Sequence, residues 1–241
     1  MVKRTGGARN PRTYYQTSQY CVAYLDILGG SNVIRNDDQC EHLNKINMIF
    51  EDALRESKLL AKDIFVKIFS DNILLAVPTN TEERIDNIQK IIVLVSNIIL
   101  EVAHYGYLMR GAITEGKFFY NNVLVYGKAL VEAVEKEEKY AIYPRVIVQK
   151  SVAKLLPQYC YKCADGWNMV NCYILEGGVS DSYYFKLTLL NQLKNNKDND
   201  KIRQKIMWAI TDFNIINNTM RKMGSLSHEI ITSKEIEYAL K

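Results

Sequence analysis

Two long helical segments alternate with apolar strand segments along the first half of the chain, and this order limits the possible folds more than any other feature. Apolar residues recur at helical spacing over 38–61, with Asp37 or Asp38 as an N-terminal cap, and again over 82–104, which ends before Gly106. The strand-type runs lie at 20–28, 65–69, 72–77 and 107–114, and the two middle runs form a hairpin. This order predicts an α+β fold, a ferredoxin-like palm with a β-α-β-β-α-β core and extra strands.

The second half of the chain predicts shorter elements followed by helices. Its expected elements are strands at 123–126, 145–149 and 168–175, helices at 128–141 and 151–157, and a helical segment over 180–240 with a linker at 195–200. A helix that carries Ile206, Trp208, Ile210 and Phe213 is expected to pack on the sheet or on a partner.

An aspartate stands inside each of two strands that are otherwise apolar. Asp26 lies in the run 20–28, and Asp71 lies at the hairpin. Burying an ionised carboxylate without a partner costs several kcal/mol. A single Asp at a strand end is most simply interpreted as a residue that caps a turn. Two such residues favour instead a positively charged partner that both carboxylates share. The palm order places both at one edge of the sheet, where oxygen ligands predict a Mg²⁺ or Mn²⁺ site.

Composition excludes several classes of function. The net charge of +4 over 241 residues gives no argument for nucleic acid as a partner. No apolar run has the length of a membrane span, and the basic start, expected to be a flexible arm over 1–19, lacks the apolar core of a secretory signal. Five cysteines, an odd number, favour reduced thiols, so we expect a cytoplasmic protein without a membrane partner.

Four motifs occur in a fixed order. They are L-D-I-L-G-G at 25–30, F-S-D-N-I-L at 69–74, M-R-G-A-I-T-E-G at 109–116, and the segment 125–148 that ends in Y-P-R-V-I-V, and a later A-D-G-W strand begins at 164. Together they resemble the class III nucleotidyl cyclases, and most closely the pyrimidine cyclases of the bacterial Pycsar anti-phage defence systems. The resemblance implies a catalytic domain over 20–178 and a C-terminal helical extension over 179–241.

The resemblance also implies a two-metal mechanism. Asp26, Asp71 and the backbone carbonyl of Ile27 would hold two Mn²⁺ or Mg²⁺ ions beside a nucleoside triphosphate. The ribose 3′-oxygen would then attack the α-phosphorus, and pyrophosphate would leave. Sites of this family are shared across a dimer interface, so a homodimer is expected.

Residues near these acids are candidates for binding the phosphates. Leu28, Gly29 and Gly30 form a loop whose N–H groups are expected to face phosphate oxygens, although a plain tight turn would also explain the two glycines. The arginine with which other members of the family stabilise the charge of the transition state is replaced here by Glu135. Arg110 and Arg145 are the expected substitutes for it. A structural ion pair of either arginine with Glu135, Glu137 or Glu138 is the alternative.

Two positions bear on the choice of base. Lys67 falls on the lysine that purine-reading members of the family use to contact the base, or it is a solvent-facing strand residue. Those members use an acidic residue together with this lysine, and the position of that acidic residue corresponds to Leu124, three residues before Gly127. An aliphatic side chain cannot accept a hydrogen bond from the amino group of a base. Leu124 therefore favours a pyrimidine.

The resemblance, together with Leu124, implies an enzyme that converts UTP or CTP to cyclic UMP or cyclic CMP, a messenger for anti-phage defence read by a cyclic-nucleotide-responsive effector. The alternatives are an adenylate or guanylate cyclase, a degenerate domain that only binds nucleotide or dimerises, and a polymerase-like palm. Loss of either acid would have favoured the degenerate domain, and both acids are present.

Overall fold

One mixed sheet forms the centre of the protein. The computed structural model describes residues 14–60, 64–173, 178–222 and 229–241. The sheet has eight strands in the order β2-β3-β1-β4-β6-β8-β7, with β5 paired to β4 beside this path. Its strands are β1 (Ser18–Ile27), β2 (Phe65–Phe69), β3 (Asn72–Pro78), β4 (Met109–Tyr120), β5 (Val125–Tyr126), β6 (Val146–Val148), β7 (Cys160–Lys162) and β8 (Asn168–Val170). The α+β class is confirmed, and β1 lies between the hairpin and β4.

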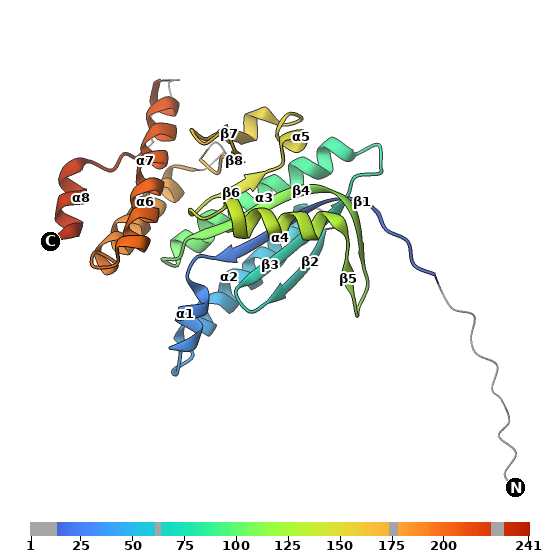
Figure 1. Cartoon of the computed structure of the whole chain (residues 1–241), viewed down its shortest axis with the longest axis horizontal. Coiled ribbons are helices and arrows are strands. Elements are labelled where there is room, and N and C mark those ends of the chain that lie inside the picture. The colour runs from blue at the N-terminus through green and yellow to red at the C-terminus, as the bar shows by residue number, and fades with distance from the viewer. Residues whose placement is uncertain (1–13, 61–63, 174–177, 223–228) are drawn as a thin grey trace, which may run out of the picture.

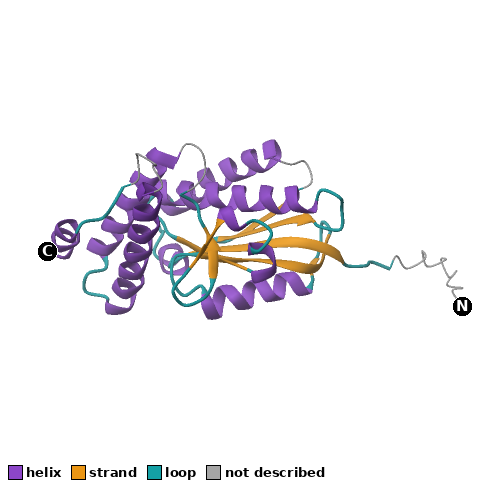
Figure 2. Ribbon diagram, turned by 90° about the horizontal axis from the view of Figure 1, so that it is seen from above, coloured by secondary structure: helices purple, strands orange, loops and turns teal. Residues whose placement is uncertain are grey.

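Helices cover both faces of the sheet (Figure 2). Helices α2 (Glu41–Leu60) and α3 (Arg84–His104) lie on one face, and α4 (Lys128–Tyr140) lies on the other. The apolar stripe of α3 explains its place, because Ile88, Ile91 and Val95 are fully buried against the sheet. Small residues of α4 allow close packing on the opposite face, where Ala129 and Ala133 are buried.

The helix expected at 38–61 is present as α2, and a short helix that was not expected precedes it. A short helix α1 (Gly30–Arg35) follows β1 directly, and α2 begins only at Glu41. The carboxylate of Asp37 accepts hydrogen bonds from the N–H groups of His42 and Leu43, at 2.9 and 2.8 Å, which confirms Asp37 as the N-terminal cap. The chain can turn into α1 because Gly29 adopts a left-handed conformation with φ of 81°.

Other boundaries differ from those expected. Strand β4 continues to Tyr120 because it pairs with β1 as far as Phe118 and its last two residues pair with β5. Phe118 is buried against the aromatic rings of Tyr20 and Phe65. Strand β7 was not expected from the sequence. The predicted helix at 151–157 is a shorter helix α5 (Lys150–Ala153) followed by a 3-10 turn η1 (Pro157–Tyr159).

The C-terminal segment is helical, as expected. Helices α6 (Gly178–Asn195), α7 (Asp200–Lys222) and α8 (Ser233–Leu240) gather at one end of the sheet (Figure 1). The turn at 196–199 lies within the predicted linker. One apolar cluster includes residues from Cys21 in β1 to Ala239 in α8, and it contains Ile206, Ile210 and Phe213 of α7. The sequence predicted packing of this helix on the sheet or on a partner; it packs on α6, and its apolar residues join the same cluster as those of the sheet.

Most of the predicted basic arm, residues 1–13, lies outside the described residues, and so do 174–175 of the last predicted strand. Ser18 and Gln19 belong to β1 rather than to an arm. Among the residues that the structure describes, no helix combines the length and apolar character needed to cross a membrane.

Candidate active site

Both predicted acids lie at the same edge of the sheet. Asp26 stands at the end of β1, opposite Asn72, the first residue of β3. Asp71 occupies the tight turn between β2 and β3, and its carbonyl oxygen accepts a hydrogen bond from the N–H group of Ile27 at 3.2 Å. The antiparallel pairing of β1 with β3 thus brings together two carboxylates that are 45 positions apart in the sequence.

Asp71 is held in place by its neighbours. It is 4% exposed, and its Oδ1 atom accepts hydrogen bonds from Ser70 Oγ at 3.0 Å and from Asn72 Nδ2 at 3.2 Å. Its Oδ2 atom lies against Gly30, where an added Cβ would overlap the carboxylate. Gly30 is therefore required to make room for Asp71, a role the sequence did not indicate.

Arg110 of β4 stands between two carboxylates. Its Nε atom donates to Asp26 Oδ2 at 2.9 Å, and its Nη2 atom lies 2.8 Å from the same oxygen. Glu137 of α4 brings Oε1 within 2.8 Å of Nε, but the single hydrogen of Nε already points to Asp26, so Oε1 has no hydrogen-bond partner. The sequence offered an ion pair with Glu137 as an alternative role for Arg110, and this ion pair is present. Asp26 is the better aligned partner of Arg110.

The electrostatics of these groups follow from burial. Burial raises the pKa of Asp26, the neighbouring charge of Asp71 raises it further, and the Arg110 guanidinium opposes both effects. Burial also raises the pKa of Glu137 to about 7, with smaller contributions in the same direction from Asp26 and Glu138, against the opposing charge of Arg110.

Glu137 is expected to make folding stability depend on pH. The folded chain keeps the Glu137 proton up to about pH 7, whereas the unfolded chain releases it near the ordinary pKa of 4.5. The free energy of unfolding should therefore fall by up to about 3 kcal/mol from this group as the pH rises from 4.5 to above 7. Urea unfolding at pH 5 and pH 8 should show a smaller loss in the Glu137→Gln variant than in the wild type. An identical loss in both proteins would contradict this assignment.

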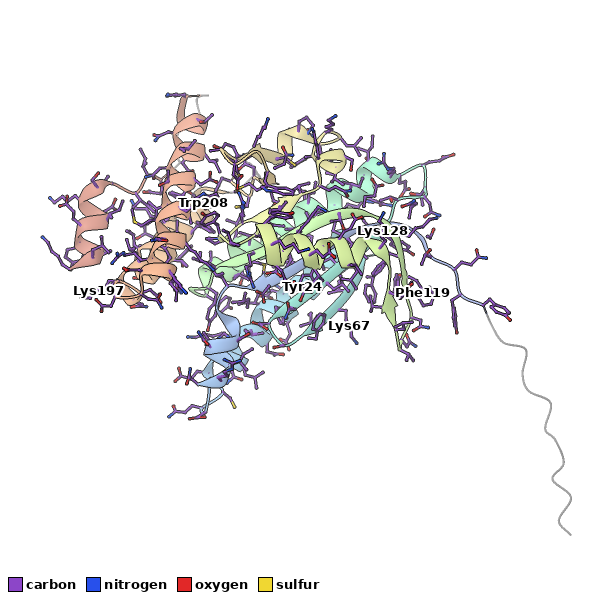
Figure 3. All side chains as sticks on the ribbon, in the orientation of Figure 1. Tyr24, Lys67, Phe119, Lys128, Lys197 and Trp208 are labelled. Carbon is purple, nitrogen blue, oxygen red and sulfur yellow. The ribbon has the colours of Figure 1, made fainter. Side chains whose placement is uncertain are left out.

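Arg145 lies in the interior rather than at the acid edge. It is 3% exposed, and its Nη2 atom donates to Asp165 Oδ2 at 2.6 Å and to the carbonyl of Tyr140 at 2.9 Å. Its guanidinium also lies 5.0 Å from the centre of the Trp208 ring, which stacks on Tyr143 (Figure 3 labels Trp208). This placement gives no support to the predicted contact of Arg145 with nucleotide. Arg145 forms a structural ion pair, which was the alternative expected for it, but its partner is Asp165 rather than one of the glutamates of α4.

Lys67 is exposed on β2 (Figure 3). It borders a cavity of about 260 Å³ between β2 and the loop that precedes β5. Asn121, Asn122 and Val123 line this cavity, and Leu124 is not among the lining residues. The polar groups that share a cavity with Lys67 are thus two asparagines that sequence reasoning missed.

The predicted phosphate loop borders a second cavity. Leu28 and Gly29 line a space of about 390 Å³, and the N–H group of Leu28 is used in a hydrogen bond to Leu108 O at 2.8 Å. No atom lies within 4 Å of an ideal Cβ at Gly29, so the loop is open on that side. Ile27 is buried, at 1% exposed.

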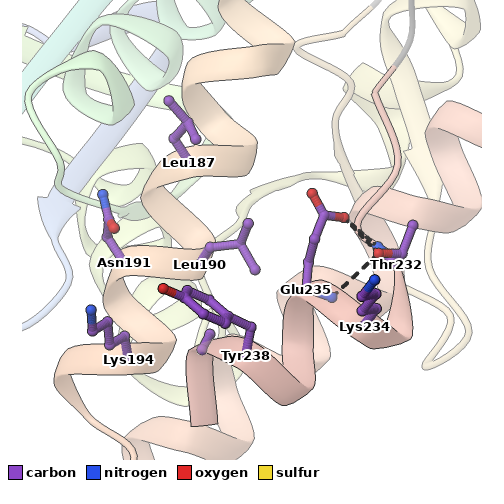
Figure 4. A pocket seen from close by; sticks show the side chains of 9 residues that line it. Leu187, Leu190, Asn191, Lys194, Thr232, Lys234, Glu235 and Tyr238 are labelled. Carbon is purple, nitrogen blue, oxygen red and sulfur yellow. Dashed lines mark hydrogen bonds between the residues drawn. The ribbon is translucent and has the colours of Figure 1, made fainter. Parts of the chain in front are cut away.

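A larger cavity lies between α6 and α8, with a volume of about 430 Å³. Figure 4 shows Leu187, Leu190 and Tyr238 around it, beside the capping box of Thr232 and Glu235. None of the predicted site residues lines it, so size alone does not identify the site.

The donor set at the acid edge suits a hard divalent cation. Asp26 offers carboxylate oxygens from the end of β1 and Asp71 from the adjacent turn between β2 and β3, and in this structure Arg110 supplies the positive charge beside Asp26. In the part of the chain that is described, no three His, Cys, Asp or Glu side chains come together as a ligand cluster. A metal would therefore be held by two carboxylates, with any further ligands from the backbone, the substrate or water.

Comparison with solved structures identifies the architecture. The monomeric guanylyl cyclase domain of the RhoGC fusion protein from the aquatic fungus Blastocladiella emersonii superposes with a TM-score of 0.54 at 10% identity, over 65% of this chain and 96% of that chain. The chain has the class III nucleotidyl cyclase fold. The adenylyl cyclase CyaB from P. aeruginosa shares this cyclase fold, with a TM-score of 0.50 at 10% identity over 65% of this chain and 95% of that chain.

A further similar structure is the guanylate cyclase domain of RhGC from Catenaria anguillulae in complex with GTP. Its TM-score is 0.51 at 10% identity, over 66% of this chain and 98% of that chain. No family model matches the sequence, and no curated protein matches it. At this level of identity the likeness establishes the cyclase fold, and the activity has to be argued from the site.

Proposed function

We propose that this protein is a nucleotidyl cyclase that converts UTP or CTP to the 3′,5′-cyclic nucleotide and pyrophosphate. The observation that carries the proposal is the meeting of Asp26 and Asp71 at one sheet edge of a cyclase fold. Loss of either acid would leave a fold able only to bind or to dimerise, and both are present and adjacent.

In this proposal Asp26, Asp71 and the carbonyl of Ile27 hold two Mn²⁺ or Mg²⁺ ions. When bound, such ions neutralise phosphate charge and lower the pKa of a coordinated hydroxyl group. The carboxylates fix the position of the α-phosphate and the ribose, and Gly30 keeps the backbone clear of Asp71. Arg110, already beside Asp26, is placed to stabilise negative charge on the transferring phosphorus.

The pyrimidine preference rests on the base side of the site. Lys67 can donate to a base oxygen, and the amide of Asn122 offers both a donor and an acceptor at the same cavity. Asn121 offers its Nδ2 donor, because its Oδ1 atom already accepts hydrogen bonds from the N–H groups of Val123 and Leu124. The cyclic nucleotide would act as a messenger for anti-phage defence through a cyclic-nucleotide-responsive effector. A purine substrate is the second candidate, because the similar structures are guanylyl and adenylyl cyclases.

A homodimer with sites at its interface is part of the proposal. The ribbon of β4 and β5 and the adjoining helix α4 expose apolar side chains, among them Val123 at 95%, Tyr126 at 63% and Val131 at 56% exposed. Large apolar side chains left exposed on neighbouring elements support a contact with a second copy of the chain.

The test of the proposed function is direct. The purified chain is incubated with Mn²⁺ and each of the four triphosphates, and the products are identified by mass. A cyclic mononucleotide and an equal amount of pyrophosphate are expected, and both should disappear in excess chelator. Absence of any cyclic product, or full activity in chelator, would remove the proposal.

A further inference from the structure

The cavity at the predicted phosphate loop is closed by the C-terminal helices. Leu28, Gly29 and Asn32 form one wall, and α6 and α7 form the other, with a volume of about 390 Å³ between them. Gln192 of α6 fixes this arrangement, because its side chain donates to the carbonyl of Gly106 at 2.8 Å, in the turn that leads to β4. The cavity therefore lies between the sheet edge that bears the acids and the C-terminal helical extension.

Lys205 of α7 brings a positive charge to this cavity. It lines the cavity and is partly buried, and it forms no ion pair with a carboxylate among the described residues. None of the residues that line the cavity is acidic. A lysine placed in this way has lost part of its hydration without gaining a counter-charge.

A second cation lies near Lys205. Burial lowers the pKa of the Lys205 ammonium group, and the charge of Arg110 lowers it further. Arg110 is itself beside Asp26. Arg110 is already paired with Asp26 and does not line the cavity, so among the described residues Lys205 is the lining cation that has no counter-charge. An extended anion with several negative oxygens would supply that counter-charge.

We propose that this cavity binds the polyphosphate tail of the nucleoside triphosphate, with Lys205 as a phosphate-binding residue supplied by the C-terminal helical extension. This inference rests on the proposed function, because it assigns the tail of the same substrate whose α-phosphate lies at Asp26 and Asp71. Gly29 leaves the loop open toward the cavity, and Asn32 stands on the same wall as a further hydrogen-bond donor. The extension thereby completes the substrate site.

The test measures binding of inorganic tripolyphosphate, which has the tail without base or ribose. Calorimetric titration with Mg²⁺ present compares the full-length wild type with Lys205→Met, Lys205→Arg and Lys222→Met. Lys222 is an exposed residue at the far end of the same helix and serves as the matched control. Thermal melting of each variant verifies that it is folded.

Lys205→Met is expected to weaken tripolyphosphate binding by about tenfold or more, the loss typical of one charge-assisted hydrogen bond. Lys205→Arg should recover most of the affinity, and Lys222→Met should bind as the wild type does. With the pyrimidine triphosphate, Lys205→Met should raise KM by a similar factor with a smaller change in kcat.

The inference is overturned if the wild type does not bind tripolyphosphate, or if Lys205→Met and Lys222→Met behave alike. It is also overturned if Lys205→Met weakens tripolyphosphate but leaves the affinity for the nucleoside triphosphate unchanged, since the cavity would then serve a free polyphosphate. If the wild type cyclises no triphosphate yet binds tripolyphosphate through Lys205, the proposed function fails and the polyphosphate cavity stands.

Discussion

Alanine at Asp26 or at Asp71 is expected to abolish formation of the cyclic nucleotide while the chain stays folded. Each acid is a proposed ligand of the divalent ions, and losing such a ligand removes several kcal/mol of transition-state stabilisation, about a thousandfold or more in rate. Folding should survive, because burial disfavours the ionised form of Asp26 and the neighbouring charge of Asp71 adds to this effect. A small rise in melting temperature would agree with the relief of this repulsion.

The measurement is kcat for cyclic nucleotide formation at saturating Mn²⁺, together with melting temperature and oligomeric state. Asp198→Ala is the matched control, because Asp198 is an exposed acid in the turn between α6 and α7. The control should retain wild-type turnover. Near-wild-type turnover in Asp26→Ala or Asp71→Ala would remove the two-metal proposal even if the fold assignment stands.

The second large effect concerns the base. UTP or CTP is expected to give a kcat/KM at least about tenfold above that of ATP and GTP, from the loss of one buried hydrogen bond alone. Leu124 cannot supply the acceptor that a purine reader uses, and the cavity beside Lys67 is lined by asparagines instead. A site shaped for one ring would also exclude the second ring of a purine.

Competition between all four triphosphates at equal concentration, with products separated by mass, gives the ratio directly. Lys67→Met should lower the kcat/KM for the preferred triphosphate, whereas Lys162→Met, a change at an exposed lysine of β7, should not. Cyclic AMP or cyclic GMP as the main product would show the pyrimidine assignment to be wrong. The cyclase fold and the proposed roles of Asp26 and Asp71 would remain.

The elements around the acids could be predicted because their signals are local. Strong apolar runs and a Ser-Asp-Asn turn are enough to predict the hairpin of β2 and β3, and the helical stripe of α3 is uninterrupted. Strand β7 could not be predicted, since three residues with mixed burial carry no periodic pattern. Its pairing with β8 depends on the turn at Gly166, which has a left-handed φ of 87°.

The parts of the candidate site that were missed depend on contacts between distant segments. Glu137 lies in a run of charges typical of a solvated helix face, and only the packing of α4 on β4 buries it beside Arg110. The position of Arg145 is decided by Asp165, twenty residues later in the chain. Lys205 stands in a polar helix with no motif around it, and only the tertiary fold brings it near Arg110.

The continuous apolar core has a consequence for how the protein loses its structure. Because the cluster that begins at Cys21 in β1 also includes Phe185 of α6 and Phe213 of α7, neither the sheet nor the helices keep a complete core alone. Thr188 adds a 2.6 Å hydrogen bond to the carbonyl of Ala103 across the same junction. Sheet and extension should then unfold in a single cooperative step. Helix α7, which carries Lys205, is therefore expected to stay in place for as long as the sheet is folded.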